Sequence, residues 1–279
     1  MKLSELYTDW LLALHNSTSP HTYRMYKKRV GDLIKALEVL GAETVEDLQG
    51  QTGKELLYHA LQKHSPSVVE QSLAAWSNFR DFVEAVKGIT LPSIPRRNLP
   101  KPKEKKPKPI SREELRKLLD YLKEKDKEAY LAALLMAYAG LRASEVLSLS
   151  KFSFQREGNR LIVRVKGKGG KERVVPLPAG VSREIEENLN LFPLFKWSSS
   201  PYYRLYRKLR QAGKRVGIAD FHPHRLRHTF GTELARRGVR PEVIRTLMGH
   251  SNLNTTAGYI GIADEELFEA VERLEFKGL

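Results

Sequence analysis

The sequence predicts a mainly α-helical chain of two domains: a helical bundle, then a mostly helical domain with a small antiparallel sheet. Three observations favour this fold class. Apolar residues recur at spacings of three and four over much of the chain, which is typical of helices. Two β-rich runs flank a glycine-rich turn in residues 160–178 and predict a hairpin. A run rich in proline and lysine, residues 95–109, separates the two parts, and 279 residues suffice for both.

The first domain is predicted to be all helix. Ser19 followed by Pro20 suits a helix cap and the first helical position. Off the apolar stripe of this helix lie Arg24, Lys27 and Lys28, which give a domain of near-zero net charge one basic helix face. The two stripes that predict its helices are Tyr23, Tyr26, Val30, Leu33 and Leu37, then Val69, Leu73, Trp76, Phe79, Val83 and Val86.

Residues 95–109 form the boundary between the domains. They contain five prolines and one large apolar residue, Leu99, so they are predicted to be an extended tether. The domains are therefore residues 1–94 and 110–279. Such a tether is usually a solvated spacer, but between two nucleic-acid-binding domains its charge would also contact phosphates.

The second domain opens with a capping-box pattern, Ser111 and Glu114. An apolar helix near residues 128–139 ends at Gly140, the predicted hairpin follows, and the helical pattern resumes at Pro201.

The net charge of +15 and the basic pI indicate a polyanionic partner, of which nucleic acid is the commonest. Residues 1–94 hold 10 basic and 11 acidic side chains, residues 95–109 hold 7 and 1, and residues 110–279 hold 31 and 21. The basic excess thus lies in the tether and the second domain. On charge alone, a merely soluble basic protein is an equal alternative.

Several classes are excluded or disfavoured by composition. The chain has no cysteine, so it has no disulfide framework and no thiolate metal site. No run is long and uncharged enough to span a bilayer, and Glu5 and Asp9 interrupt any N-terminal signal pattern. A cytoplasmic protein without a membrane partner is expected.

Six separated polar residues fit one chemistry, the cleavage of a phosphodiester. A guanidinium grips two phosphate oxygens at once, lysine and histidine donate protons, and a tyrosine supplies a nucleophile. Glu145 follows Arg142 by three residues and is placed to orient it. Taken singly, each has a plainer interpretation, such as a surface Arg–Glu pair or a packing tyrosine. The six candidates are Arg142, Lys168, His224, Arg227, His250 and Tyr259.

The hairpin turn, KGKGGKER, is basic but has neither the spacing nor the following helix of a nucleotide-binding P-loop. Its lysines are candidates for phosphate contact, and one is a candidate to protonate a leaving oxygen. The full set of candidate DNA-contacting residues is Arg24, Lys27, Lys28, Lys166 and Lys171.

Three histidines in FHPHRLRHTFGTEL, residues 221–234, suggest a metal site, but no carboxylate or cysteine completes a ligand set nearby. No metal is therefore expected. His224 and Arg227 fall on one helix face, which suits two donors to one phosphate. His228 is expected to be a core or supporting residue.

GLRASE, VKGKGGKERVVPL, PHRLRHTFGTEL and LMGHSNLNTTAGYI together resemble the tyrosine recombinase (phage-integrase) family in order and spacing, over residues 110–262. STSPHTYRMYKKRVGDLIKAL resembles the family's N-terminal core-binding region, which implies a SAM-like bundle for the first domain. The pattern is most similar to the Xer recombinases, including their short archaeal members.

The resemblance implies a role for each candidate. Tyr259 attacks the scissile phosphate and forms a 3′-phosphotyrosine. Arg142 and Arg227 clamp the non-bridging oxygens, and His250 donates to one of them. The family has either His or Trp at this last position.

The resemblance further implies that Lys168 is the general acid for the departing 5′-hydroxyl, that His224 assists proton transfer and that Glu145 supports the first arginine. Preorganised cations stabilise the charge of a phosphoryl transition state and can replace a divalent metal. A covalent protein–DNA link conserves the phosphodiester's energy, so neither ATP nor any cofactor is expected.

The end of the chain, residues 264–279, predicts an acidic amphipathic helix, which avoids DNA and needs a protein surface. It can fold back on its own domain. In the family the C-terminal segment docks on a neighbouring protomer, so exchange within a homotetramer on paired DNA sites is favoured. Its apolar stripe, the candidate oligomer contact, is Leu267, Phe268, Val271 and Leu274.

The resulting hypothesis is a site-specific recombinase of double-stranded DNA that resolves chromosome dimers at a dif-like site. Three alternatives stay open: an integrase of a virus or plasmid with the same chemistry, a monomeric type IB topoisomerase, and a catalytically silent DNA-binding protein.

Overall fold

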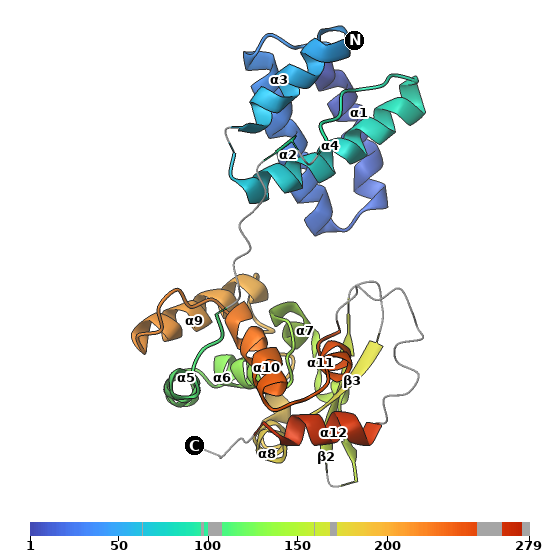
Figure 1. Cartoon of the computed structure of the whole chain (residues 1–279). Helices are drawn as coiled ribbons and strands as arrows, with labels where there is room; N and C mark the ends of the chain where they lie inside the picture. The colour runs from blue at the N-terminus through green and yellow to red at the C-terminus, as the bar shows by residue number, and fades with distance from the viewer. Residues whose placement is uncertain are drawn as a thin grey trace. The chain divides into compact units, whose positions relative to one another are not determined.

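The computed structural model describes residues 1–62, 64–95, 98–99, 108–158, 160–167, 172–249 and 264–274. The chain divides into two compact units, Met1–Lys105 and Lys106–Leu279 (Figure 1). The first unit is helical, and the second is mostly helical with one small antiparallel sheet. The predicted fold class is confirmed.

The first unit is built on helices whose buried faces follow the predicted stripes, except that Val86, near the end of α4, is 57% exposed. Trp10, Trp76 and Phe79 fill its core, and the rings of Trp10 and Phe79 meet edge to face at 5.4 Å. The predicted cap at Ser19 is present, since its side chain accepts a hydrogen bond from the Thr22 N–H at 3.2 Å. The elements are α1 (Leu3–Ser17), α2 (Pro20–Val39), a 3₁₀ turn (Glu46–Leu48), α3 (Gly50–Gln62) and α4 (Pro66–Lys87).

The segment that follows α4 packs against the helical core of the first unit. The Trp76 indole N–H donates to the Pro92 carbonyl at 2.8 Å, and Leu99 is only 6% exposed within the same core. Leu99 lies in the run predicted to be a solvated tether. It departs from that expectation because burying a leucine side chain contributes about 1.5–3 kcal/mol.

The second unit surrounds one buried helix, α6, in which every residue from 129 to 137 is buried. Helices α5, α7, α8, α9 and α10 all contact it. The predicted capping box at the start of α5 is present, with Ser111 and Glu114 each bonding the other's backbone N–H. The helices are α5 (Arg112–Lys125), α6 (Lys127–Tyr138), α7 (Ala143–Ser148), α8 (Ala179–Glu186), α9 (Pro201–Arg215), α10 (His224–Arg236), α11 (Pro241–Met248) and α12 (Asp264–Glu272), with 3₁₀ turns at Lys151–Ser153 and Leu189–Leu191.

The sheet is antiparallel in the order β1 (Phe154–Glu157), β2 (Arg160–Lys166) and β3 (Glu172–Pro176). Strands β2 and β3 are the predicted hairpin. Val163 stands opposite both Phe154 and Val175, so one face of the sheet joins the core. The sequence did not predict β1, because this four-residue strand has one buried side chain and no visible alternation.

The start of the second unit is fastened to α10. The Arg225 guanidinium donates to the carbonyls of Lys108 at 2.8 Å and Ala219 at 2.6 Å. The Ile110 N–H donates to the Thr229 hydroxyl at 3.0 Å. The last residues of the predicted tether are therefore held on the helix that carries His224 and Arg227.

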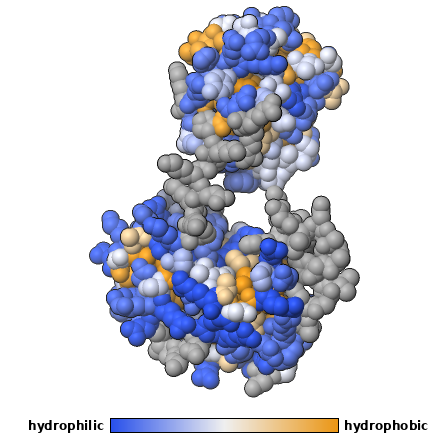
Figure 2. Space-filling view, in the orientation of Figure 1, coloured by the Kyte–Doolittle hydropathy of each residue, from blue (hydrophilic) through white to orange (hydrophobic). Residues whose placement is uncertain are grey.

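The visible face of both units is mostly hydrophilic, with small and separate hydrophobic areas (Figure 2). Within the described part of the chain, no helix combines the length and hydropathy needed to cross a membrane.

Candidate active site

A glycine turn after α6 aims Arg142. Gly140 has a φ of +64°, and a Cβ on it would lie 2.5 Å from the Phe230 ring. Only glycine fits both constraints without strain. The chain then enters α7 with Arg142 as its N-cap residue. The arginine thus extends from a fixed point between two helices.

Glu145 organises the site. Its carboxylate accepts from the Arg142 backbone N–H and Nη1, both at 2.8 Å, and from Arg173 Nη1 and Nη2 at 3.0 and 2.9 Å. Arg227 Nη1 lies 3.8 Å away. Burial favours a raised pKa for Glu145, but hydrogen bonds from Arg173 and the Arg142 backbone outweigh it and hold the pKa below its usual value. We call Arg142, Glu145, Arg173 and Arg227 the arginine–glutamate cluster.

Arg227 is the most deeply buried cation of the cluster, with a side chain only 6% exposed. Its guanidinium donates to the carbonyls of Gly140 and Met248 and so joins α10 to the ends of α6 and α11. Burial, together with the nearby charge of Arg142, lowers the pKa of Arg227 to about 10. The group stays protonated at neutral pH, and two backbone carbonyls fix its position.

His224 is the first residue of α10 and lies one turn before Arg227. Partial desolvation and then the charges of Arg227 and Arg142 lower its pKa. The imidazole is therefore mainly neutral at pH 7 and can accept or donate a proton. Arg142 is 37% exposed at its side chain, so this end of the cluster is open to a ligand.

The cluster carries three positive charges and one negative charge, and its excess suits a dianionic or monoanionic phosphate. Preorganised cations stabilise the charge that builds on phosphate oxygens in the transition state. Since Glu145 fixes the arginines before a substrate arrives, little reorganisation is needed. The arrangement is thus suited to phosphoryl transfer.

Arg173 was not among the candidates from sequence. It lies on β3 with a side chain 10% exposed and also donates from Nε to the Leu247 carbonyl at 3.0 Å. The available signal was strand alternation. Arg173 shares a strand face with Val175, which is fully buried, so an arginine there must have an internal partner.

Of the six catalytic candidates, the structure brings together Arg142, His224 and Arg227, and it adds the supporting residue Glu145. Lys168, Lys171, His250 and Tyr259 lie outside the described residues. In the sequence, Lys168 falls between the last residue of β2 and the first of β3, and His250 directly follows Gly249, whose carbonyl accepts from Arg142 Nη2 at 3.3 Å.

The three histidines at and near the start of α10 are not all placed as the sequence predicted. Among the described residues, no three His, Asp or Glu side chains gather as metal ligands. His228, expected in the core or behind the site, is instead exposed. The reason is that Leu226 and Phe230 occupy the buried face of α10, which turns His228 outward.

The candidate DNA-contacting residues that can be placed are all exposed. Arg24, Lys27 and Lys28 lie on one side of α2 beside α1, where Lys28 also pairs with Asp32 at 3.2 Å. Lys166 is the last residue of β2, and its side chain is 77% exposed. Its Nζ lies 3.4 Å from Glu172 Oε1. Their contact with DNA stays a prediction.

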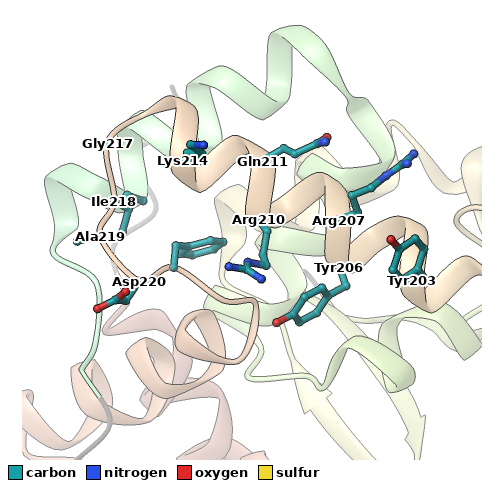
Figure 3. Close-up of a pocket in the computed structure, with 11 residues that line it drawn as sticks. Tyr203, Tyr206, Arg207, Arg210, Gln211, Lys214, Gly217, Ile218, Ala219 and Asp220 are labelled. Carbon is teal, nitrogen blue, oxygen red and sulfur yellow. The ribbon is translucent and has the colours of Figure 1, made fainter.

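A groove of about 640 Å³ runs along α9 and adds basic residues that the sequence analysis did not single out. Figure 3 shows Tyr203, Tyr206, Arg207 and Arg210 along the helix, with Lys214 towards its end. Arginine and lysine side chains gathered along one groove suit a polyanionic ligand.

The C-terminal helix α12 packs on its own unit, against α11 and β3 (Figure 1). Arg240 holds Glu266 through two hydrogen bonds of 2.9 and 2.7 Å, and Arg160 holds Glu265 at 3.1 Å. This is the fold-back arrangement that the sequence left open. The side chains assigned to an oligomer contact are here at most 9% exposed: Leu267, Phe268, Val271 and Leu274.

Comparisons with known proteins identify the class that this fold and cluster define. The sequence profile of the phage integrase family matches residues 108–266. A tyrosine recombinase of Thermosipho africanus is 30% identical over 288 residues, covering 98% of this chain and 99% of the relative. Tyrosine recombinase XerA of Thermococcus kodakarensis is 32% identical over 274 residues, covering 91% and 89%.

Solved structures agree on the fold. Lambda integrase bound to a COC′ core site matches with a TM-score of 0.68 at 15% identity, over 90% of this chain and 96% of that one. XerH bound to difH matches with a TM-score of 0.67 at 20% identity, over 89% and 78%. The chain belongs to the phage integrase family. It is a site-specific tyrosine recombinase similar to the Xer enzymes.

Proposed function

We propose that this chain cuts and rejoins double-stranded DNA through a 3′-phosphotyrosine at Tyr259, and that it acts as an Xer-type recombinase on a dif-like site. The observation that carries this proposal is the arginine–glutamate cluster. Arg142 and Arg227 converge on Glu145 and leave one side of Arg142 open, which supplies two cations for one phosphate.

The chemistry balances without a cofactor. The Tyr259 oxygen attacks phosphorus as its phenolic proton passes to the neutral His224 imidazole. The bond from phosphorus to the 5′ oxygen breaks, and Lys168 donates a proton to that oxygen. Arg142 and Arg227 stabilise the non-bridging oxygens, with His250 as a further donor and His224 moving protons at the edge of the site. Attack by the 5′-hydroxyl of another strand reverses the steps, so no ATP is needed.

DNA binding is assigned to the exposed basic surfaces of both units. The α9 groove, with Arg207, Arg210 and Lys214, supports contact by the second unit. The exposed residues Arg24, Lys27 and Lys28 on α2 support contact by the first. Such contacts to phosphates supply affinity and register rather than sequence choice.

The Xer setting is supported by the kind of relative that matches along most of its length. The XerA protein of Thermococcus kodakarensis covers 91% of this chain, and the XerH neighbour is described as bound to difH. We assign the working form to a homotetramer on paired sites, in which α12 exchanges between protomers. An integrase of a mobile element would use the same chemistry on another target.

A nicked duplex carrying the recognition site tests the chemistry. The site is first selected from source DNA by its binding to the full chain. Cleavage next to the nick releases a short strand, so the covalent adduct accumulates and is seen on a denaturing gel. We expect an adduct that resists EDTA, disappears in Tyr259→Phe and persists in the matched variant Tyr121→Phe, with DNA binding intact in both.

The outcomes separate the alternatives. Binding without an adduct from the wild type identifies a silent DNA-binding protein. Relaxation of supercoiled DNA that lacks the site identifies a topoisomerase. An adduct that survives Tyr259→Phe removes Tyr259 as the nucleophile, and activity lost in EDTA indicates a metal-dependent reaction.

A further inference from the structure

We propose that Arg173 is a positioning residue for the strand-transfer reaction: it fixes Glu145 and the C-terminal end of α11, and through them the arginines that hold the phosphate. This inference rests on the proposed function, since it assigns a role within the same site.

Arg173 contacts Glu145 directly. Arg173 Nη1 and Nη2 donate to the two carboxylate oxygens at 3.0 and 2.9 Å, a two-pronged pairing that lysine cannot make. The same carboxylate receives the Arg142 backbone and side chain. Since both oxygens are held by Arg173, the carboxylate cannot rotate away from Arg142.

Arg173 also contacts the C-terminal end of α11. Arg173 Nε donates to the Leu247 carbonyl at 3.0 Å, and Arg227 donates to the next carbonyl, that of Met248. Gly249 has a φ of +62°, and a Cβ on it would lie 2.9 Å from Arg173 Nη1. The end of α11 is therefore packed directly on the Arg173 guanidinium, one residue before His250 in the sequence.

Arg173 and Glu145 are both largely buried. The Arg173 side chain is 10% exposed and Glu145 is 5% exposed, whereas Arg142 is 37% exposed. Arg142 is thus the most open cation of the cluster, whereas each guanidinium nitrogen of Arg173 already donates to Glu145 or to the Leu247 carbonyl. Arg173 also comes from β3, five residues after Lys168 in the chain, so one side chain joins the hairpin, α7 and α11.

The test is a double-mutant cycle on single-turnover cleavage, with the full chain saturating the nicked site duplex. The variants are Arg173→Gln, Glu145→Gln and both together. A misplacement of about 1 Å costs roughly 10²-fold in rate, so we expect Arg173→Gln to lose about that factor while its affinity for the site is unchanged. Because Arg173 acts through Glu145, the double variant should be no slower than the slower single variant.

Arg156→Gln is the matched control. It removes an arginine from the same sheet that pairs with Glu186 at 2.7 Å but is 63% exposed, and it should cleave at the wild-type rate. Arg173→Lys keeps the positive charge but loses the two parallel hydrogen bonds to the Glu145 carboxylate, so this variant should also cleave slowly. It replaces Arg173→Gln in the cycle if thermal unfolding shows that the glutamine variant is not folded.

Each outcome of the cycle either supports or overturns the positioning role of Arg173. Slow cleavage with intact binding and non-multiplicative losses supports the positioning role. Wild-type rates in the Arg173 variants, or losses that multiply in the double variant, overturn it while the adduct itself upholds the proposed function. A wild type that forms no adduct overturns both.

Discussion

A single carboxylate, Glu145, holds the charges of this site in place. Its side chain is 5% exposed and takes hydrogen bonds from two arginines, with a third guanidinium 3.8 Å away. Removing one partner from a buried ion pair costs about 3–5 kcal/mol, because the remaining charges stay buried without compensation. We therefore expect Glu145 to determine both the stability of the chain and its proposed reaction rate.

The stability that Glu145 contributes should depend on pH in a defined direction. Its pKa is lowered in the folded chain, so the contribution is complete above the unfolded value of about 4.3 and is lost as the pH falls through the lower folded value. We expect the difference in unfolding free energy between wild type and Glu145→Gln to be about 3–5 kcal/mol near neutral pH. Urea unfolding across a pH series measures it.

Glu186→Gln serves as the control for that series. Glu186 pairs with Arg156 on the surface, and such a pair contributes about 0–1 kcal/mol. The account is contradicted if the difference in unfolding free energy between wild type and Glu145→Gln stays constant into strong acid or grows on acidification.

At the scale of elements, the site depends on how α6 ends and α7 begins. Gly140 adopts a left-handed conformation against the Phe230 ring, and its carbonyl accepts a hydrogen bond from Arg227. This turn sets both the direction of Arg142 and one of the two carbonyl contacts of Arg227.

Gly140→Ala should therefore be more damaging than a glycine substitution elsewhere. The left-handed backbone costs an alanine roughly 1–2 kcal/mol, and overpacking against the ring adds about 1–3 kcal/mol. Gly158→Ala is the matched control, because its φ is +59° and nothing lies within 4 Å of a Cβ there. Chemical unfolding of both variants should show a clearly larger loss for Gly140→Ala, and equal losses would remove the packing argument.

At the scale of the whole molecule, the proposed assembly on DNA rests on two features: the net positive charge of the second unit and the acidic last helix, α12. The helix α12 covers apolar surface of its own unit, and each large side chain that it buries contributes about 1.5–3 kcal/mol. In the proposed tetramer the same side chains cover the equivalent surface of a neighbour, so little free energy separates the two arrangements.

Deleting residues 264–279 should lower the stability of the second unit and damage the complex of paired sites more than the binding of a single site. Gel shifts with one and two sites measure this, and Glu272→Ala, an exposed change on the same helix, should alter neither. Equal losses in both complexes would confine α12 to its own unit.

The sequence predicted what local patterns and motifs encode. It predicted helices α2, α4, α5 and α6, the hairpin of β2 and β3, the caps at Ser19 and Ser111, and the gathering of Arg142 and Arg227 at one site. It missed features that exist only through tertiary contact. Strand alternation places Arg173 on the buried face of β3, but its partners Glu145 and Leu247 follow only from tertiary packing, and the burial of Leu99 depends on a core made by distant helices.

The central claim is that these cations serve a covalent tyrosine, and peptide mapping of the trapped adduct tests it most directly. Trypsin releases residues 246–273 as one peptide, which contains a single tyrosine, Tyr259. After nuclease treatment, fragmentation by mass spectrometry should place a nucleotide remnant on Tyr259, joined through its 3′ phosphate. A remnant on any other residue, or one joined through a 5′ phosphate, would contradict the account.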